Sequence, residues 1–473
     1  MTTPVSPEKP RGFIDRTGAQ ADAERAIVEK VGAVYAQWGF ERLETPAIEY
    51  TDALGKFLPD LDRPNEGVFS FQDDERWLSL RYDLTAPLAR YVAEHFDALP
   101  KPYRRWAAGP VWRNEKPGPG RYREFWQCDA DTVGSASPAA DAEMIAMACG
   151  ALAAAGVARQ GFAVAFSTRR LLDAVLENCG IPADAYSTRL VVLRAIDKFD
   201  RLGPSGVDAL LGSGRKDESG DFTKGAGLDP GQRQQILTLV TAYSSSRIET
   251  LGNLIKLAGE EPVAELIAID ESLAKLGVSG AMAPISPTIV RGLEYYTGAV
   301  FEAQLIGNGG AHFGSVGGGG RYDGLVSRFR AEPVPATGFS IGVSRLAAAM
   351  QAQSDAQAQG PVVVLVMDQL RVGDSLAIAA ELRAAGIRAE AYLGGGGMKA
   401  QLKYADKRNA PIAIIQGGDE LAKGVVTLKD LKRGLEISHL AGEDRETYAK
   451  MRAQVQQEVP RAQLVERVKK MLP

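Results

Sequence analysis

The chain has 473 residues, a formal net charge of −4 at pH 7, and 45% hydrophobic and 24% charged residues. This length is too great for one ordinary hydrophobic core and predicts two or three domains. The composition excludes a disordered protein, and the net charge argues against a nucleic-acid binder that works by bulk electrostatic attraction.

No targeting segment, membrane segment or metal site is expected. Residues 1–10 carry no apolar core after a positively charged start, and no later apolar run reaches the roughly 18 residues needed to span a bilayer. The chain has three cysteines and three histidines, namely Cys128, Cys149, Cys179, His95, His312 and His439. The cysteines are odd in number, and neither set shows close metal-ligand spacing, so we expect no disulfide framework and no metal cluster. A cytoplasmic location is predicted.

The N-terminal region begins with a predicted helix. Between Asp22 and Trp38, apolar side chains recur at helical spacing, and Gly39 ends the run. Residues 40–46 then predict a strand that ends at Pro46. The helical pattern alone is that of an ordinary amphipathic helix packed on a core.

Two runs rich in aromatic and alternating residues, 109–115 and 121–131, are separated by the turn formers at 117–120. This arrangement predicts a β-hairpin. An arginine held on such a hairpin, here Arg113, suits a phosphate because its planar fork donates in pairs and keeps its charge. A surface hairpin with scattered charges is the alternative when the hairpin is considered alone. The strand period of two places four side chains on one face, namely Phe125, Gln127, Asp129 and Asp131.

Residues of about 170–280 are predicted to be mainly helical. Residues 212–227 interrupt them with a stretch too polar and glycine-rich to pack. Three further blocks follow, beginning at Ile289, Gly314 and Thr337. The blocks read Ile-Val-Arg-Gly-Leu-Glu-Tyr-Tyr, Gly-Ser-Val-Gly-Gly-Gly-Gly-Arg-Tyr-Asp and Thr-Gly-Phe-Ser-Ile-Gly-Val-Ser-Arg-Leu.

The C-terminal region begins after residues 351–360, which are polar and low in complexity, as a linker should be. Residues 362–366 and 412–415 are short apolar runs typical of buried strands, and a helix is predicted through Ala385. Strands that alternate with helices predict a small α/β domain with a largely parallel sheet.

A basic face is predicted in this C-terminal region. Residues 361–473 contain 18 Lys plus Arg and 14 Asp plus Glu, a balance of +4, which leaves −8 on residues 1–360. Lys399, Lys403 and Lys407 recur every fourth residue and would share one helical face. A solvated basic face is the default interpretation, and a phosphate contact is the sharper one.

The hairpin and the three later blocks together resemble the histidyl-tRNA synthetase family, which belongs to the class II aminoacyl-tRNA synthetases. The resemblance runs over nearly the whole chain and implies a multidomain α/β and α+β fold. Residues 1–350 would form a class II antiparallel-sheet catalytic domain with a helical insertion at about 170–280. After the linker at 351–360, residues 361–473 would form an α/β anticodon-binding domain. The implied reaction is ATP-dependent ligation of histidine to histidine tRNA through a histidyl-adenylate.

The resemblance also implies partners. The helix and strand before Pro46 correspond to the family's motif 1, which builds its dimer interface, so a homodimer is expected. Only the resemblance supports dimerisation, because an amphipathic helix on a core explains the pattern equally well. L-histidine, ATP and histidine tRNA are the expected substrates, with Mg²⁺ as the accompanying metal.

Three arginines correspond to catalytic and ATP-binding positions of the family, namely Arg113 in motif 2, Arg291 in the Arg-Gly-Leu-x-Tyr-Tyr block and Arg345 in motif 3. The chain has no Gly-x-x-x-x-Gly-Lys-Ser/Thr loop to cradle phosphates. Arginines and Mg²⁺ are therefore expected to supply positive charge to the phosphates. The resemblance implies that Arg113 and Arg291 bind the α-phosphate from two sides, while Arg345 stacks on adenine. Each arginine alone is more often a surface or ion-pair residue.

Histidine recognition is implied for six residues, namely Asp83, Thr85, Gln127, Asp131, Tyr295 and Tyr296. The first three would hold the amino group, and Asp131 and Tyr296 would read the imidazole, with Tyr295 as a pocket wall. Core packing is the alternative for the two tyrosines. The glycines at 317–320 are expected to allow close approach to the substrate rather than to bind phosphate. Asp83 and Asp131 are aspartates where many bacterial members of the family have glutamates, and the carboxylate is kept.

The tRNA candidates are Lys116, Arg121, Lys399, Lys403 and Lys407. The motif 2 loop, residues 116–120, is unusual because Gly118 provides no long polar side chain. That departure puts the usual recognition of the tRNA acceptor end in doubt.

Two other functions stay open. One is a catalytically silent regulatory paralogue that pairs with ATP phosphoribosyltransferase; such relatives usually lack the C-terminal domain, which this chain keeps. The other is a different class II synthetase, such as the prolyl or threonyl enzyme. The Arg-Gly-Leu-Glu-Tyr-Tyr block at 291–296 argues against the latter.

Overall fold

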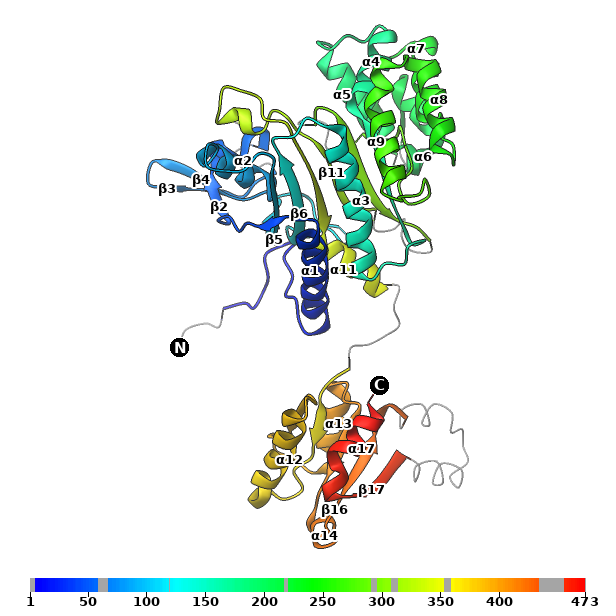
Figure 1. Ribbon diagram of the computed structural model, residues 1–473. Helices are drawn as coiled ribbons and strands as arrows, with labels where there is room; N and C mark the ends of the chain where they lie inside the picture. Colours follow the sequence, from blue (N-terminus) through cyan, green and yellow to red (C-terminus); the bar gives the residue numbers. More distant parts are fainter. Residues whose placement is uncertain are drawn as a thin grey trace. The chain divides into compact units, whose positions relative to one another are not determined.

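The computed structural model contains two compact units, Met1–Ser354 and Asp355–Pro473 (Figure 1). It describes residues 5–57, 67–118, 120–216, 220–290, 296–307, 314–352, 359–433 and 455–472. Two predicted site residues, Arg291 and Tyr295, lie outside the described residues, as does most of the predicted linker.

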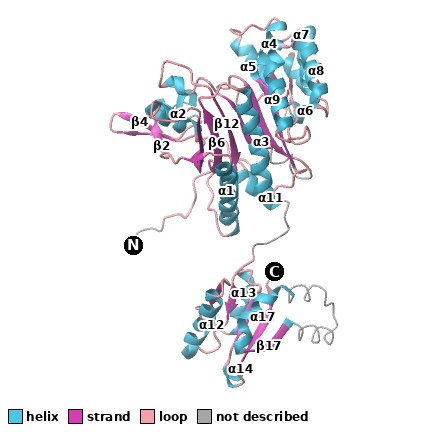
Figure 2. Ribbon diagram, in the orientation of Figure 1, coloured by secondary structure: helices cyan, strands magenta, loops and turns pink. Residues whose placement is uncertain are grey.

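A seven-stranded sheet forms the centre of the first unit (Figure 2). Its strands, in order across the sheet, are β1 (Glu41–Arg42), β5 (Tyr103–Trp112), β6 (Glu124–Val133), β12 (Ala336–Gly342), β11 (Ser315–Arg321), β10 (Ala299–Leu305) and β7 (Phe162–Thr168). Every neighbouring pair is antiparallel except β1 and β5. The predicted antiparallel-sheet architecture is therefore confirmed.

The predicted hairpin is strands β5 and β6, which pair along their whole lengths. The pairing begins earlier than predicted, so that Arg105 lies directly opposite Asp131. Side chains on β6 alternate between two faces, as the strand period requires. Cys128 and Ala130 belong to the main hydrophobic core, whereas Gln127 and Asp131 line a cavity on the other face.

Three helices cover the core face of this sheet: α1 (Ala19–Gln37), α3 (Pro138–Ala155) and α11 (Val343–Ala352) (Figure 1). Val31 of α1 and Ile145 of α3 are fully buried in one core with Phe339 of β12. The predicted N-terminal helix is thus confirmed. This packing leaves the opposite face of β6, β12 and β11 to the cavity.

Helix α3 is strongly apolar along its whole length. Ser137 caps its first turn by accepting a hydrogen bond from the Ala139 amide, and Gly156 ends it with a positive φ. Within the described residues, it is the one helix long and apolar enough to cross a membrane, a case that the apolar-run criterion did not anticipate. Two thirds of it is buried within the first unit, so it serves as a core helix.

A smaller sheet and a helix flank the strands that carry the cavity. The three strands are β2 (Ile48–Tyr50), β4 (Arg76–Leu80) and β3 (Ser70–Asp73), and a 3₁₀ turn at Thr51–Phe57 directly follows β2. Helix α2 (Thr85–Glu94) follows β4 and begins beside the cavity.

Among the described residues between β7 and β10, the structure has the helices α4 (Arg169–Asn178), α5 (Tyr186–Ile196), α6 (Phe199–Leu211), α7 (Pro230–Val240), α8 (Arg247–Ala258) and α9 (Ala264–Lys275). The expectation that residues 212–227 would not pack is wrong, because β8 (Gly214–Lys216) pairs with β9 (Phe222–Lys224). The glycines make this pairing possible. A Cβ atom on Gly214 would lie 2.2 Å from the Thr223 carbonyl oxygen, and one on Gly225 would lie 2.3 Å from the Gly212 carbonyl oxygen.

The second unit is built on a five-stranded sheet in the order β14 (Ala389–Ala391), β13 (Val362–Val364), β15 (Ile412–Ile415), β16 (Val425–Asp430) and β17 (Gln456–Pro460). In the described part of this unit, the sheet is accompanied by helices α12 (Val372–Ala384), α13 (Met398–Lys407), α14 (Gly418–Ala422) and α17 (Leu464–Met471). Alternate residues of β13 and β15 enter two separate cores, so both faces of the sheet are covered.

The prediction of a largely parallel sheet is half wrong. β14, β13 and β15 are parallel, but β16 and β17 are antiparallel to their neighbours. The connection at 416–424 is shorter than the dozen or so residues that a parallel crossover needs. The chain must therefore reverse direction after β15.

Candidate active site

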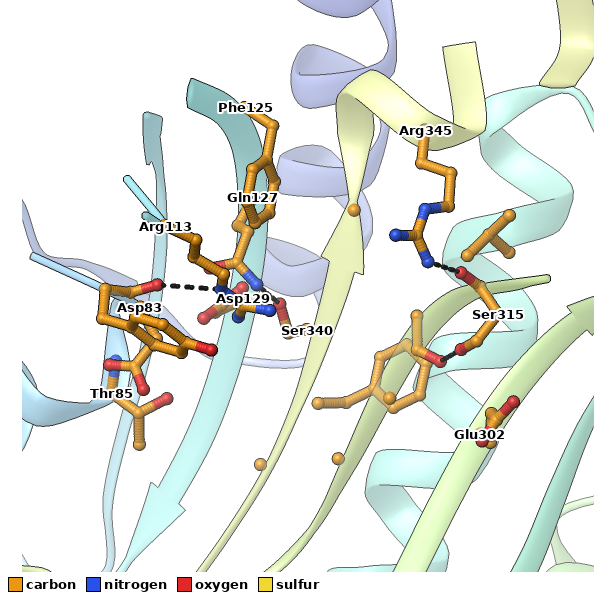
Figure 3. A pocket seen from close by; sticks show the side chains of 18 of the residues that line it. Asp83, Thr85, Arg113, Phe125, Gln127, Asp129, Glu302, Ser315, Ser340 and Arg345 are labelled. Carbon is orange, nitrogen blue, oxygen red and sulfur yellow. Dashed lines mark hydrogen bonds between the residues drawn. The ribbon is translucent and has the colours of Figure 1, made fainter. Parts of the chain in front are cut away.

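A cavity of about 360 Å³ opens on the face of the large sheet that α1, α3 and α11 do not cover (Figure 3). It is lined by β6, β10, β11 and β12, by the start of α11, and by the segment that leads into α2. Of the predicted site residues, it brings together Asp83, Thr85, Arg113, Gln127, Asp131, Tyr296 and Arg345, and also Lys116 and Arg121. The other predicted lysines, on α13, belong to the second unit.

Arg113 is held between two aromatic rings. Its guanidinium carbon lies 4.3 Å from the centre of the Tyr82 ring and 5.1 Å from that of Phe125. Its Nε donates to the Tyr82 carbonyl oxygen at 3.4 Å. The Tyr82 hydroxyl donates to Glu115 at 2.7 Å, and burial raises the pKa of that phenol to about 12. These contacts fix a permanent positive charge at one side of the cavity.

Arg345 approaches the cavity from the opposite side (Figure 3). It lies in the first turn of α11, directly after β12. Its Nη1 donates to the Ser315 carbonyl oxygen at 2.6 Å, which ties the side chain to the start of β11. Two arginines thus border one cavity, an arrangement suited to a polyanion.

Asp83 lies at the start of α2. Its Oδ1 accepts hydrogen bonds from the amides of Thr85, at 3.0 Å, and Ala86, at 2.8 Å. The carboxylate therefore satisfies the first two amides of α2 through one oxygen, and no described residue donates a hydrogen bond to the other. The same hydrogen bonds position Thr85 at the cavity wall.

Asp131 is almost completely buried at the base of the cavity. The Tyr322 hydroxyl donates to its Oδ1, and Arg105 Nη2 lies 3.0 Å from its Oδ2. Burial raises the pKa of the Asp131 carboxyl, while Arg105 and the Tyr322 hydrogen bond act in the opposite direction. Oδ1 of Asp131 thus has a hydrogen-bond donor, whereas Oδ2 has an ion-pair partner but no hydrogen-bond donor among the described residues.

Asp129 also lines the cavity. The strand period predicted which face of the strand it lies on, but no function was predicted for it. It is only 2% exposed. Ser340, its direct neighbour on β12, hydrogen-bonds to it and also accepts a hydrogen bond from Gln127 Nε2 at 2.8 Å. Burial, together with the charge of Asp131, raises the pKa of Asp129 to about 7 against the opposing charge of Arg105.

Arg105 and Tyr322 are two further residues that sequence reasoning missed. Arg105 is the largest fully buried side chain of this unit, and its Nη2 also donates to the Leu84 carbonyl oxygen at 2.6 Å. It therefore connects the base of the cavity to the segment between Asp83 and Thr85. The available signals were an arginine on an otherwise apolar alternating face of β5 and the place of Tyr322 in the block that begins at Gly314.

The glycines of β11 line the cavity as well. A Cβ atom on Gly319 would lie 2.0 Å from the Gly338 carbonyl oxygen, and one on Gly317 would lie 2.8 Å from the Ser340 carbonyl oxygen. Close packing of β11 against β12 thus accounts for glycine at these two positions. Approach of substrate to this strand stays a prediction.

The motif 2 loop closes tightly next to the cavity. The amides and carbonyls of Gly118 and Arg121 bond to each other, at 2.9 Å and 3.1 Å. In the second unit, Lys399, Lys403 and Lys407 all lie on α13 and are exposed. Their shared helical face is confirmed, and phosphate binding stays a prediction.

In the described part of the chain, no group of three or more His, Cys, Asp or Glu side chains is placed to hold a metal ion. The three cysteines are free and buried.

The comparisons with known proteins agree with this geometry. Residues 12–346 match the family model for histidyl-tRNA synthetase, and residues 361–471 match that for the anticodon-binding domain. The chain belongs to the histidyl-tRNA synthetase family. Among its curated relatives, a histidine–tRNA ligase from Caulobacter vibrioides is 55% identical over 98% of this chain and 96% of the relative. One from Cereibacter sphaeroides is 53% identical over 98% and 97%.

Solved structures of the histidyl-tRNA synthetase family have the same fold. The enzyme from Nostoc sp. is 27% identical, with a TM-score of 0.74 over 99% of this chain and all of the other. A protein from Bacillus halodurans described as an ATP phosphoribosyltransferase regulatory subunit/histidyl-tRNA synthetase is 25% identical, with a TM-score of 0.66 over 85% of this chain. The much higher identity to the curated ligases and the matched anticodon-binding domain disfavour the regulatory alternative.

Proposed function

We propose that this chain attaches histidine to histidine tRNA in two steps, through a histidyl-adenylate made from ATP. The observation that carries the proposal is a single cavity with arginines on two sides and carboxylates at its base, in a chain that belongs to the histidyl-tRNA synthetase family. The first step requires cations to bind the phosphates of ATP. It also requires anions to bind the ammonium group of histidine.

The arginines act on ATP. The histidine carboxylate attacks the α-phosphorus, pyrophosphate leaves, and negative charge builds on the phosphate oxygens. Arg113, stacked between aromatic rings, binds the α-phosphate with its charge already in place. Arg291 stabilises the same phosphate from the other side, and Arg345 stacks on adenine and reaches the outer phosphates. The roles of Arg291 and Arg345 rest on their family positions.

The histidine ligands lie deeper in the cavity. Asp83, Thr85 and Gln127 bind the amino group, and the free Oδ2 of Asp83 is the charged acceptor. Asp131 and Tyr296 read the imidazole. A carboxylate has about four acceptor positions, so Asp131 can accept a further hydrogen bond beside the one from Tyr322, while Arg105 lies in an ion pair with its Oδ2. Tyr295 completes the wall.

Mg²⁺ accompanies ATP. The metal is usually held by substrate phosphates with one or two carboxylates, rather than by a cage of protein ligands. Glu302 on β10 is buried at the cavity wall and fits that requirement. When bound, the ion neutralises charge on the leaving pyrophosphate.

The tRNA and a second copy of the chain are the macromolecular partners. The domain assignment is a catalytic domain over residues 1–350, with its insertion at about 170–280, a linker at 351–360 and an anticodon-binding domain over 361–473. Lys116 and Arg121 are proposed for the acceptor end, and Lys399, Lys403 and Lys407 for phosphates elsewhere. Helix α1 and strand β1 form the proposed homodimer interface, and the protein acts in the cytoplasm.

Amino-acid-dependent exchange between ATP and pyrophosphate tests this function. Histidine should support exchange, whereas proline and threonine should not, because buried polar partners reject a ligand that leaves them unpaired by about 10⁴-fold or more. Exchange with proline or threonine in place of histidine would identify a different synthetase. An absence of exchange with all three would identify a silent relative.

A further inference from the structure

Two buried acceptor atoms at the cavity wall have neither a hydrogen-bond donor nor an ion-pair partner among the residues that the structure describes. They are Oε1 of Gln127 and Oδ1 of Asp129; Oδ2 of Asp131 also has no hydrogen-bond donor there, but it is ion-paired with Arg105. Gln127 is 7% exposed and Asp129 is 2% exposed, and both side chains line the cavity. A buried acceptor without a donor costs about 1–3 kcal/mol, and more when it is charged. A ligand with several N–H groups would supply the missing donors.

The two acceptors are aimed by one hydroxyl. Ser340 accepts from Gln127 Nε2 and hydrogen-bonds to Asp129, so it fixes the amide and the carboxylate side by side. Figure 3 shows Gln127, Asp129 and Ser340 grouped on the same side of the cavity as Asp83 and Thr85. This is the end of the cavity to which we assign the amino group.

The other carboxylates are more heavily occupied. One oxygen of Asp83 accepts hydrogen bonds from the first two amides of α2. Asp131 has Tyr322 on one oxygen and Arg105 beside the other. Asp129 has Ser340 alone, so it is the carboxylate with the most acceptor capacity left.

We propose that Asp129 is a substrate-binding residue that accepts a hydrogen bond from the α-ammonium group of histidine, together with the Oε1 atom of Gln127. The inference rests on the proposed function and adds to it a second carboxylate for the ammonium. An ammonium group can donate three hydrogen bonds. Asp83, Gln127 and Asp129 can each accept one of them.

The charges around Asp129 support this assignment. Asp131 on the same strand and Asp83 before α2 add negative charge, whereas Arg105 on β5 and Arg81 before α2 add positive charge. Arg105 already faces Asp131, and Arg81 donates to the carbonyl oxygens of Pro110 and Thr45. A cationic ligand group therefore relieves the repulsion among three carboxylates.

Two analogues of histidine separate its ends. Histidinol keeps the ammonium and the imidazole, whereas imidazolelactate keeps the imidazole and carboxylate but has a hydroxyl in place of the ammonium. Each is used as an inhibitor of histidine-dependent pyrophosphate exchange by the full-length protein. Asp129→Asn should weaken inhibition by histidinol about tenfold or more, as expected for the loss of a charge-assisted hydrogen bond, and change that by imidazolelactate less than twofold.

Two further variants control for general damage. Asp131→Asn alters the imidazole end, so it should weaken both analogues by similar factors. Ser340→Ala removes the hydroxyl that aims Gln127 and Asp129, so it should shift the ratio of the two inhibition constants in the same direction by a smaller factor. This variant also tests the proposal if Asp129→Asn does not fold.

The outcomes are distinguishable. A selective loss for histidinol supports the inference. Equal losses for both analogues in Asp129→Asn, or unchanged ratios in both the Asp129 and Ser340 variants, would overturn it while leaving the proposed function intact. A wild-type protein without histidine-dependent exchange would overturn the proposed function and this inference together.

Discussion

The Arg105 guanidinium lies 3.0 Å from the Asp131 carboxylate, directly across the β5–β6 ladder, with both side chains buried. Because Arg105 also donates to the Leu84 carbonyl, this ion pair connects the base of the cavity to the segment that leads into α2. Removing one partner of a buried pair strands the other charge. Arg105→Leu should therefore lower the free energy of unfolding by about 3–5 kcal/mol, measured by urea denaturation.

The double variant Arg105→Leu with Asp131→Asn is the control for this prediction. It removes the stranded charge, so it should be more stable than Arg105→Leu alone. Equal stabilities of the single and double variants would show that the charge of Asp131 is not compensated by Arg105.

The raised pKa of Asp129 predicts a pH-dependent stability. Burial raises it to about 7 in the folded chain, whereas an unfolded aspartate titrates near about 3.9. The folded chain therefore holds a proton that the unfolded chain releases, and this group's contribution to stability is full below about pH 4 and is lost as the pH rises to about 7. Asp129→Asn should gain stability relative to wild type as the pH rises from about 4 to about 7. A difference that stays constant across that range would contradict the assignment.

Neighbouring glycines of β11 provide a matched pair of substitutions. A Cβ atom on Gly319 would lie 2.0 Å from a backbone carbonyl oxygen, whereas one on Gly318 would meet nothing closer than 3.4 Å. Gly319→Ala should lower the free energy of unfolding by at least about 1–3 kcal/mol, the usual cost of overpacking, and Gly318→Ala by clearly less. Thermal unfolding of the two variants is the measurement. The same Tm in both would refute the packing account of this strand.

A truncation tests whether the first unit alone forms the adenylate and whether the second unit is needed for tRNA recognition. All predicted activation residues precede residue 351, and the contacts divide the chain between Ser354 and Asp355. A chain that ends near Gln359 should still form histidyl-adenylate but charge tRNA poorly. Circular dichroism establishes that the shortened chain is folded. Aminoacylation with unchanged kcat/KM would remove the second unit from tRNA recognition.

The motif 2 loop predicts little dependence on the extra guanosine that histidine tRNA usually carries before position 1. Reading a base requires side-chain donors or acceptors at its edge, which Gly118, Pro119 and Gly120 cannot supply. Lys116 is mainly a phosphate partner, and Arg121 lines the cavity. Two transcripts that differ only in this nucleotide should be charged with comparable kcat/KM. A loss above about 100-fold, or nearly 3 kcal/mol, on removing it would refute the prediction.

The fold was predictable where local periodicity decided it. The hairpin, the N-terminal helix and the strand at Ile412–Ile415 follow from alternation and helical spacing. The direction of β16 and the pairing of β8 with β9 could not be predicted from this periodicity, because they depend on connection length and on close backbone approach. Both are properties of three-dimensional packing that the polar and glycine-rich sequence obscures.

The candidate site was predictable in its residues more than in its partnerships. Strand period placed Gln127, Asp129 and Asp131 on one face, and all three line the cavity. The period cannot show what lies across the ladder, so Arg105 and Ser340 were missed. Their contacts decide how much acceptor capacity each carboxylate retains.

Helix α3 has a consequence for how the chain is made. Its buried face packs against α9, β10 and β12, and β12 does not end until Gly342, far later in the sequence. During synthesis, part of this apolar helix therefore stays exposed until the whole insertion and β12 have been made. Ribosome-bound fragments that stop within the insertion should expose this helix and depend on chaperones to remain dispersed.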